Sequence, residues 1–112
     1  MKIELEEKRP GVFVIVLAGE MDMSTSPDVR TTMAPLFRSG TAQVIVDLAG
    51  VTYIDSSGIA TFVEGLQLSQ KTAARLTLAG MNAAVEAVFE LAYLREVFHI
   101  VPNVEAVLSE GA

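Results

Sequence analysis

The sequence predicts a single α/β domain with a mixed, mostly parallel β-sheet of about five strands and about four α-helices, in the order ββαβαβαβα. Short apolar runs rich in β-branched residues alternate with segments whose apolar residues recur at helical spacing. Strands that are buried on both faces and separated by helices are typical of parallel sheets. With 112 residues, 51% of them hydrophobic, the chain can bury a core, and we expect one domain over residues 1–112.

Five segments are expected to form the strands. Residues 2–7 alternate apolar and charged side chains, as in a strand with one solvent-exposed face. Residues 12–18, 43–48 and 75–79 are largely apolar runs, which indicates strands buried on both faces. The last expected strand covers residues 98–101 and is short.

The expected helices are marked by their boundaries. Ser26, which is followed by proline, is expected to cap the first helix, and Pro35 to kink it or convert its last turn. The second helix is expected over residues 56–72. Asn82 is a suitable cap for the third helix, and Pro102-Asn103 begins the fourth.

The charge balance and the absence of cysteine exclude several classes of function. There are 14 acidic and 8 basic side chains, a formal charge of -6, whereas nucleic acids and anionic membranes attract basic surfaces. Without cysteine the chain has no disulfide, zinc-thiolate site or cysteine nucleophile. Residues 1–7 alternate instead of forming the apolar block of a signal peptide, and the longest apolar run, residues 12–18, is too short to span a bilayer. We expect a cytoplasmic protein that binds neither nucleic acid nor membrane.

The segment Asp55-Ser56-Ser57-Gly58 joins an expected loop, residues 49–57, to the second helix. Sites in α/β sheets lie in loops beyond the carboxyl ends of strands, which points to this loop and to the expected loop 19–26. A helix N-terminus offers unpaired N–H groups and a partial positive charge. A serine there either caps the helix or accepts a phosphate, whose charge the helix end tolerates. The four residues alone leave both roles open.

A resemblance to a known family is carried by the longer segment VDLAGVTYIDSSGIA, residues 46–60. This segment resembles the central signature of the STAS domain and, more narrowly, that of the anti-sigma factor antagonists. Upstream, Gly19-Glu20-Met21-Asp22 is similar to the family's Gly-Glu-Leu-Asp segment. Downstream, the third-helix pattern of the family is matched by Ala84-Val85, Phe89, Leu91 and Leu94. The resemblance covers essentially the whole chain and implies a STAS domain over residues 1–112.

The resemblance also implies a function. In this family the first serine of Asp-Ser-Ser-Gly is the phosphoacceptor, which corresponds to Ser56. An anti-sigma factor with serine kinase activity phosphorylates this serine with ATP. The unphosphorylated antagonist binds the kinase and thereby releases the sigma factor. A PP2C-type phosphatase reverses the modification. The aspartate of Gly-Glu-Leu-Asp lies near the acceptor and corresponds to Asp22. The expected partner-binding residues are Asp22, Asp55, Ser56, Ser57 and Gly58, with Ser57 structural.

Such a switch needs no conformational change. A phosphate beside Asp55 and Asp22 places like charges on a docking surface, and an unpaired charge buried at an interface costs several kcal/mol. We expect a monomer or weak dimer without catalytic activity, cofactor or metal, because the single His99 has no positioned partner in the sequence and no Walker motif occurs. Two alternatives remain: a STAS accessory subunit of a transporter, such as a lipid-transport ATPase complex, and a stressosome-like scaffold subunit.

Overall fold

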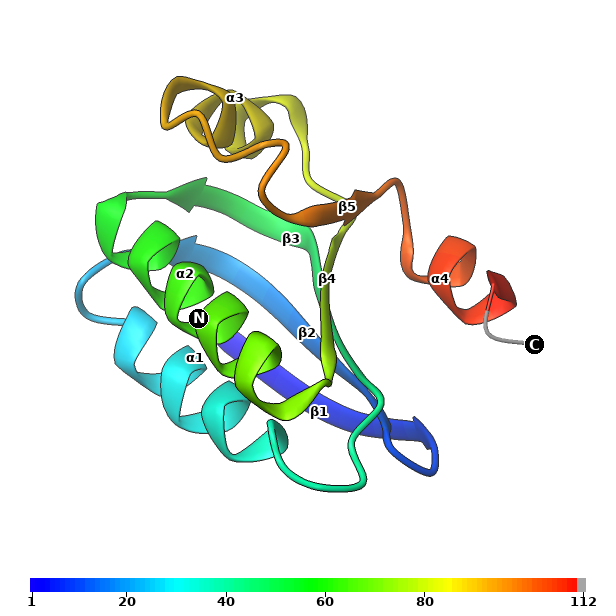
Figure 1. Ribbon diagram of the computed structural model, residues 1–112. Coiled ribbons are helices and arrows are strands. Elements are labelled where there is room, and N and C mark those ends of the chain that lie inside the picture. Colours follow the sequence, from blue (N-terminus) through cyan, green and yellow to red (C-terminus); the bar gives the residue numbers. More distant parts are fainter. Residues whose placement is uncertain (111–112) are drawn as a thin grey trace.

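The computed structural model describes residues 1–110 and contains one five-stranded sheet with the order β1-β2-β3-β4-β5 (Figure 1). β1 and β2 form an antiparallel hairpin, whereas β2, β3, β4 and β5 are parallel to their neighbours. The predicted mixed, mostly parallel sheet and its element order are confirmed. The strands are β1 (Lys2–Arg9), β2 (Val12–Met21), β3 (Gln43–Ile54), β4 (Arg75–Ala79) and β5 (His99–Val101).

The connections between the parallel strands are helical. The helices are α1 (Ser26–Met33), α2 (Ser56–Thr72), α3 (Ala83–Leu91) and α4 (Val104–Glu110), and a short 3-10 segment, η1 (Ala34–Leu36), follows α1. Pro35 lies in η1, so its predicted effect on the end of the first helix is confirmed. Within residues 1–110, no helix combines the length and the apolar character that a membrane crossing requires.

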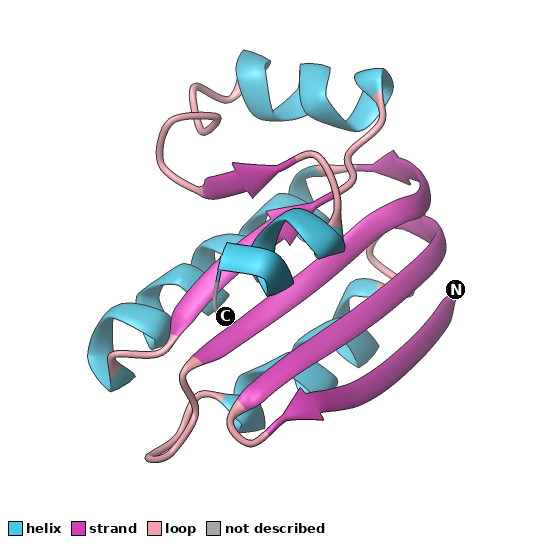
Figure 2. Cartoon of the chain, turned by 90° about the vertical axis from the view of Figure 1, so that its right-hand side faces the viewer, coloured by secondary structure: helices cyan, strands magenta, loops and turns pink. Residues whose placement is uncertain are grey.

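Different helices pack on the two faces of the sheet. α1 and α2 lie side by side on one face, and α4 lies on the other (Figures 1 and 2). The larger core is formed by β2, β3 and β4 with α1, α2 and α3, and its fully buried side chains include Ile15, Leu48, Phe62 and Phe89. The smaller core packs Val107 of α4 against side chains of the strands, namely Val12, Val14, Ile45, Ala79 and Val101. Burial of this apolar surface is the dominant favourable term in folding.

β2 and β3 are longer than the sequence predicts. Their expected ends are Ala18 and Leu48, but they continue as paired strands to Met21 and Ile54. The pairing contains two irregularities, between Val16 and Ala18 and between Gly19 and Glu20, and such bulges let a strand continue after its alternation breaks. The prediction that residues 19–26 and 49–57 are loops is therefore wrong for their first parts. Only the turns after Met21 and Ile54 remain, at the same end of two neighbouring strands.

α2 packs through small side chains as well as large ones. Helical spacing predicts a buried stripe of Ile59, Phe62, Val63 and Leu66, but only Phe62 is fully buried. The other buried residues of the helix are Gly58, Thr61, Gly65 and Ser69. A Cβ at Gly65 would lie 2.8 Å from the methyl carbon of Met33, so the glycine lets α1 and α2 approach each other closely.

Asn82 links α3 to the sheet through two hydrogen bonds. Its Oδ1 accepts from the N–H of Val85 at 2.9 Å, which confirms the predicted cap, and its Nδ2 donates to the carbonyl oxygen of Val51 at 2.8 Å. We predict that Asn82→Ala lowers the free energy of unfolding by about 1–3 kcal/mol, because a capping bond and a bond to β3 are both lost. Urea unfolding followed by circular dichroism measures the change.

Asn103 provides the matched control for this prediction. Its Oδ1 accepts from the N–H of Ala106 at 2.8 Å at the start of α4, in an exposed position. Asn103→Ala should therefore lower the free energy of unfolding by only about 0.5–1 kcal/mol, the range of an ordinary exposed cap. Equal losses in the two variants would contradict the role given to the bond between Asn82 and Val51.

Candidate functional site

The turn between β3 and α2 is held by the carboxylate of Asp55. Asp55 is the N-cap residue of α2, and its Oδ1 accepts from the backbone N–H groups of Ser57 at 2.9 Å and Gly58 at 3.4 Å. Its own N–H donates to the carbonyl oxygen of Met21 at 3.2 Å, which ties the turn to the end of β2. Two of the N–H groups that a helix start leaves unpaired are thereby satisfied. The sequence left open that a serine caps this helix; in the structure the cap is Asp55.

The two serines of the motif differ in exposure and bonding. Ser57 is half-buried; its Oγ donates to Oδ1 of Asp55 at 2.5 Å and lies 3.1 Å from Oγ of Ser26. Ser56, the first residue of α2, is exposed, and its hydroxyl does not take part in the hydrogen bonds of this turn. The Ser56 hydroxyl is therefore the accessible one, and the Ser57 hydroxyl is part of the turn.

Gly58 allows α2 to begin against the ends of the two long strands. A Cβ at this position would lie 2.6 Å from Cγ1 of Ile54 and 3.1 Å from Cγ of Met21, both buried. Contacts this short are repulsive, so a larger residue would displace the start of the helix. Each member of the motif thus has a distinct place: Asp55 caps, Ser56 is exposed, Ser57 binds the cap and Gly58 permits close packing.

A second acidic residue, Asp22, holds the neighbouring turn between β2 and α1. Its Oδ1 accepts from the N–H of Ser24 at 2.9 Å, from the Ser24 hydroxyl at 2.7 Å and from the N–H of Thr25 at 3.2 Å. The Thr25 hydroxyl in turn donates to the carbonyl oxygen of Glu20 at 2.8 Å. Thr25 is the N-cap residue of α1, so the prediction that Ser26 caps this helix is wrong. The Asp22 turn already leads into the helix, and Ser26 becomes its first residue, only 3% exposed.

Hydrogen bonds favour the ionised form of both aspartates. The Ser57 hydroxyl is the main group that holds the pKa of Asp55 below its ordinary value; burial and the negative charge of Asp22 act in the opposite direction. The pKa of Asp22 is lowered chiefly by the hydroxyl of Ser24 and then by its N–H. The effect of Asp22 on Asp55 means that the two charges interact, and both are present at neutral pH.

The structure brings the sequence-predicted residues together in these two turns. Asp55, Ser56, Ser57 and Gly58 form the start of α2, and Asp22 comes beside them because β2 and β3 end as a pair. Ser26 is the residue that sequence reasoning missed. A serine before a proline signals a helix start, but nothing local signals a contact with a serine 31 positions away.

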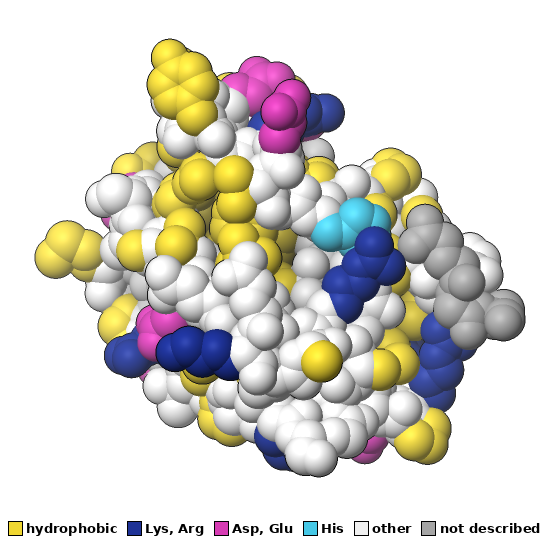
Figure 3. All heavy atoms as spheres, viewed as in Figure 1, with side chains coloured by type: hydrophobic (Ala, Val, Ile, Leu, Met, Phe, Trp, Pro, Cys, Tyr) yellow, Lys and Arg dark blue, Asp and Glu magenta, His cyan; other side chains and the backbone are white. Residues whose placement is uncertain are grey.

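The surface around the turns is hollowed and partly apolar. A hollow of about 260 Å³ between α1 and α2 is lined by Met23, Ser26, Pro27, Arg30, Ser57 and Thr61. Figure 3 shows hydrophobic side chains gathered between α2 and α3. We use the name apolar patch for six at least partly exposed side chains of α2, of the end of α3 and of the segment after it: Ile59, Val63 and Leu66, which also pack against the core, and Leu91, Tyr93 and Val97. Exposed apolar area next to polar residues is typical of protein-binding surfaces.

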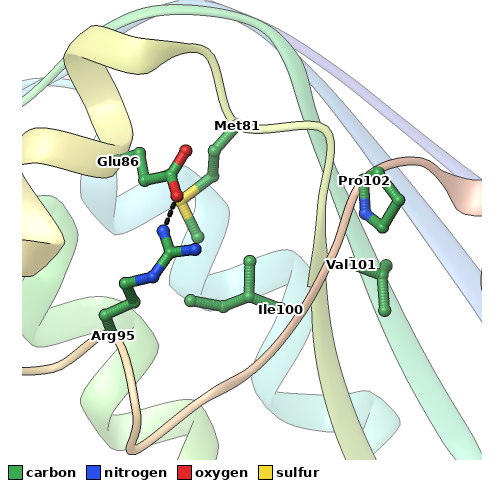
Figure 4. A pocket seen from close by; sticks show the side chains of 6 residues that line it. All are labelled: Met81, Glu86, Arg95, Ile100, Val101 and Pro102. Atoms are coloured by element: carbon green, nitrogen blue, oxygen red, sulfur yellow. Dashed lines mark ion pairs between the residues drawn. The ribbon is translucent and has the colours of Figure 1, made fainter.

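Another hollow, of about 350 Å³, lies beside β5 (Figure 4). It is lined by the ion pair of Glu86 and Arg95 and by four further side chains, those of Met81, Ile100, Val101 and Pro102. It contains none of the residues of the two acidic turns. The candidate site is therefore the surface around Asp22, Asp55 and Ser56.

The lowered pKa of Asp55 gives a testable pH dependence. Because its folded-state pKa lies below the ordinary value of 3.8, the ionised group stabilises the fold above that pH, and this stabilisation is lost as pH falls through the folded-state pKa. Asp55→Asn keeps an oxygen that can cap but has no charge to titrate. We predict a shallower loss of stability below about pH 4 in the variant than in the wild type. Urea midpoints between pH 2.5 and pH 7 measure this, and superimposable curves would contradict the assignment.

Comparison with known proteins identifies the family and agrees with the fold. The family model of the STAS domain matches residues 4–107. The anti-sigma-B factor antagonist of Staphylococcus epidermidis is 28% identical over 88 residues, 79% of this chain and 82% of the relative. The phosphorylated form of the Bacillus cell fate determinant SpoIIAA has a similar fold, with a TM-score of 0.79, 19% identity and coverage of 99% of this chain and 100% of that chain. The murine anion transporter Slc26a9 also contains this fold, with a TM-score of 0.78, 16% identity and coverage of 95% of this chain but 19% of the transporter. The chain belongs to the STAS domain family.

Proposed function

We propose that this STAS domain is an anti-sigma factor antagonist that is switched by phosphorylation of Ser56. In the unphosphorylated state it binds a kinase-type anti-sigma factor and thereby releases the sigma factor. The kinase transfers a phosphoryl group from ATP to Ser56 and the complex dissociates, and a PP2C-type phosphatase restores the binding form. The names of the relatives support the antagonist role. SpoIIAA, which has a similar fold, is named an anti-sigma factor antagonist and has been solved in a phosphorylated form, which supports the modification.

The observation that carries the proposal is the contrast between Ser56 and Ser57. The exposed Ser56 hydroxyl lies at the first position of α2, where a kinase can reach it, whereas Ser57 is engaged by Asp55 and Ser26. A phosphate on Ser56 lies at the positive end of the helix dipole, which favours a negative charge there. The modified side chain is thus compatible with the fold, and the modification acts on the surface.

The switch itself is electrostatic. Phosphorylation adds about -1.5 to -2 charges beside two aspartates that are ionised at neutral pH. The formal charge of the chain, -6, then becomes roughly -8, with the change confined to one helix end. A partner that fits the unmodified turn would have to bury this additional charge, which costs several kcal/mol. Each 1.4 kcal/mol corresponds to a tenfold change in affinity.

The docking face follows from the position of these residues. We place it over the turns at Asp22 and Asp55, the exposed side of α2 and the adjoining apolar patch. The hydrophobic side chains supply buried area, and the acidic turns supply the part whose charge changes. Met23, 80% exposed beside Asp22, adds a flexible apolar side chain that adapts to a partner surface.

Incubation with a candidate anti-sigma kinase and ATP tests the modification. We predict that the wild-type protein gains the mass of one phosphoryl group, that Ser56→Ala gains none and that Ser39→Ala behaves as the wild type. Ser39 is the matched control because it is another exposed serine, and it precedes β3, at the opposite end of that strand from Asp55. Intact-mass measurement reports the result. A wild-type protein that gains no phosphate with any cognate kinase tried would contradict the proposal and would favour the transporter-accessory role.

Substitution of the acceptor tests the charge mechanism. We predict that Ser56→Asp weakens binding of the anti-sigma factor at least tenfold, about 1.4 kcal/mol or more, while the thermal midpoint stays nearly unchanged. An acidic residue in the first turn of a helix is favoured by the dipole, so the fold tolerates it. Isothermal titration calorimetry measures the affinity, with Ser56→Ala as the uncharged control. Equal affinities of the two variants would show that charge is not the cause.

A further inference from the structure

A short chain of hydroxyl groups connects the first residues of α1 and α2. Ser26 is 3% exposed, and its Oγ lies 3.1 Å from Oγ of the half-buried Ser57. Oγ of Ser57 in turn lies 2.5 Å from Oδ1 of Asp55. The chain therefore runs from a buried side chain of α1 to the carboxylate that caps α2.

The direction of the hydrogen bonds follows from the number of protons. A serine hydroxyl has one proton to donate, and an ionised carboxylate can only accept. Asp55 is ionised at neutral pH, so the Ser57 proton points to Asp55. The contact between Ser26 and Ser57 must then be a bond in which Ser26 donates and Ser57 accepts. Both the proton and one lone pair of the Ser57 oxygen are occupied.

We infer that Ser26 is a positioning residue, which keeps Ser57 bound to Asp55 and so makes Ser56 the acceptor of the phosphoryl group. Donation from Ser26 polarises the Ser57 hydroxyl and strengthens its bond to Asp55, as in other hydrogen-bond chains. The part of this inference that concerns phosphorylation rests on the proposed function. The part that concerns Asp55 depends only on the geometry of the turn.

The chemistry of phosphoryl transfer explains why the hydrogen bonds of the Ser57 hydroxyl matter. A lone pair of the serine oxygen forms a bond to the γ-phosphorus of ATP, the bond from that phosphorus to the ADP oxygen breaks, and the hydroxyl proton passes to a general base of the kinase. At Ser57 the bond to Asp55 would have to break before the proton could leave, and the bond from Ser26 already occupies one of the two lone pairs of the oxygen. At Ser56 no such bond has to break, so the transfer is directed there.

The first measurement needs no partner protein. Carboxyl carbon NMR gives the pKa of Asp55 in the wild type, Ser26→Ala, Ser26→Thr and Ser69→Ala. We expect the pKa of Asp55 to rise toward its ordinary value in Ser26→Ala and to stay near the wild-type value in Ser26→Thr, which keeps the hydroxyl. The hollow that borders Ser26 gives the added methyl group space. Ser69→Ala is the control for loss of a buried hydroxyl, because Ser69 is 7% exposed and donates to Leu66 on the same helix. An unchanged pKa in Ser26→Ala would overturn the inference.

The second measurement locates the phosphate in the same variants by fragment-ion mass spectrometry after treatment with the kinase. We expect Ser56 to carry nearly all of the phosphate in the wild type and in Ser69→Ala, and the ratio of phosphate on Ser57 to phosphate on Ser56 to rise about fivefold in Ser26→Ala, the factor that one hydrogen bond of ordinary net strength represents. Phosphate mainly on Ser57 in the wild type, or an unchanged ratio in Ser26→Ala, would overturn the inference. If no variant is phosphorylated, the proposed function fails, and the pKa of Asp55 still decides whether Ser26 positions Ser57.

Discussion

The candidate site depends on one interaction, the capping of α2 by the carboxylate of Asp55. The cap pairs two N–H groups of the helix and receives the hydroxyl of Ser57, so three consecutive residues take fixed places around it. Ser56 is therefore exposed at the first helical position, next to the Asp55 carboxylate, which the same hydrogen bonds keep ionised. The exposed serine that we propose as the phosphoacceptor and its acidic neighbour are thus placed by a single feature of local structure.

The sheet brings the second charge to this cap. β2 and β3 continue past two bulges and end as a pair, so the turn at Asp22 is held beside the turn at Asp55. Gly58 then permits α2 to start directly against the last pair of side chains. Since the turns are fixed by backbone pairing and by buried packing, the charge of the surface can change while the framework stays the same. In the proposed function, the core supplies the stability of the fold and the exposed helix end supplies the change in charge.

Much of this organisation could be predicted from the sequence, and the exceptions have physical causes. Apolar periodicity predicted the order of the elements and the extent of α2, and the position of Pro35 predicted the change at the end of α1. Periodicity failed at the ends of β2 and β3, because a bulge breaks the alternation without ending the pairing. Along α2 it found the residues that pack against the core, Ile59, Phe62, Val63 and Leu66, but not the small buried ones, which close approach to α1 at Gly65 favours. The role of Ser26 was beyond any local pattern, since it depends on a contact across 31 positions.

The central claim is that phosphorylation of Ser56 changes the charge of a preformed turn and leaves the fold unchanged. A comparison of backbone amide NMR spectra before and after phosphorylation tests it most directly. The account predicts shifted signals in the two turns, residues 20–26 and 53–60, and unchanged signals in β4, α3 and β5. Shifts that extend through those elements would show a conformational switch and contradict the account.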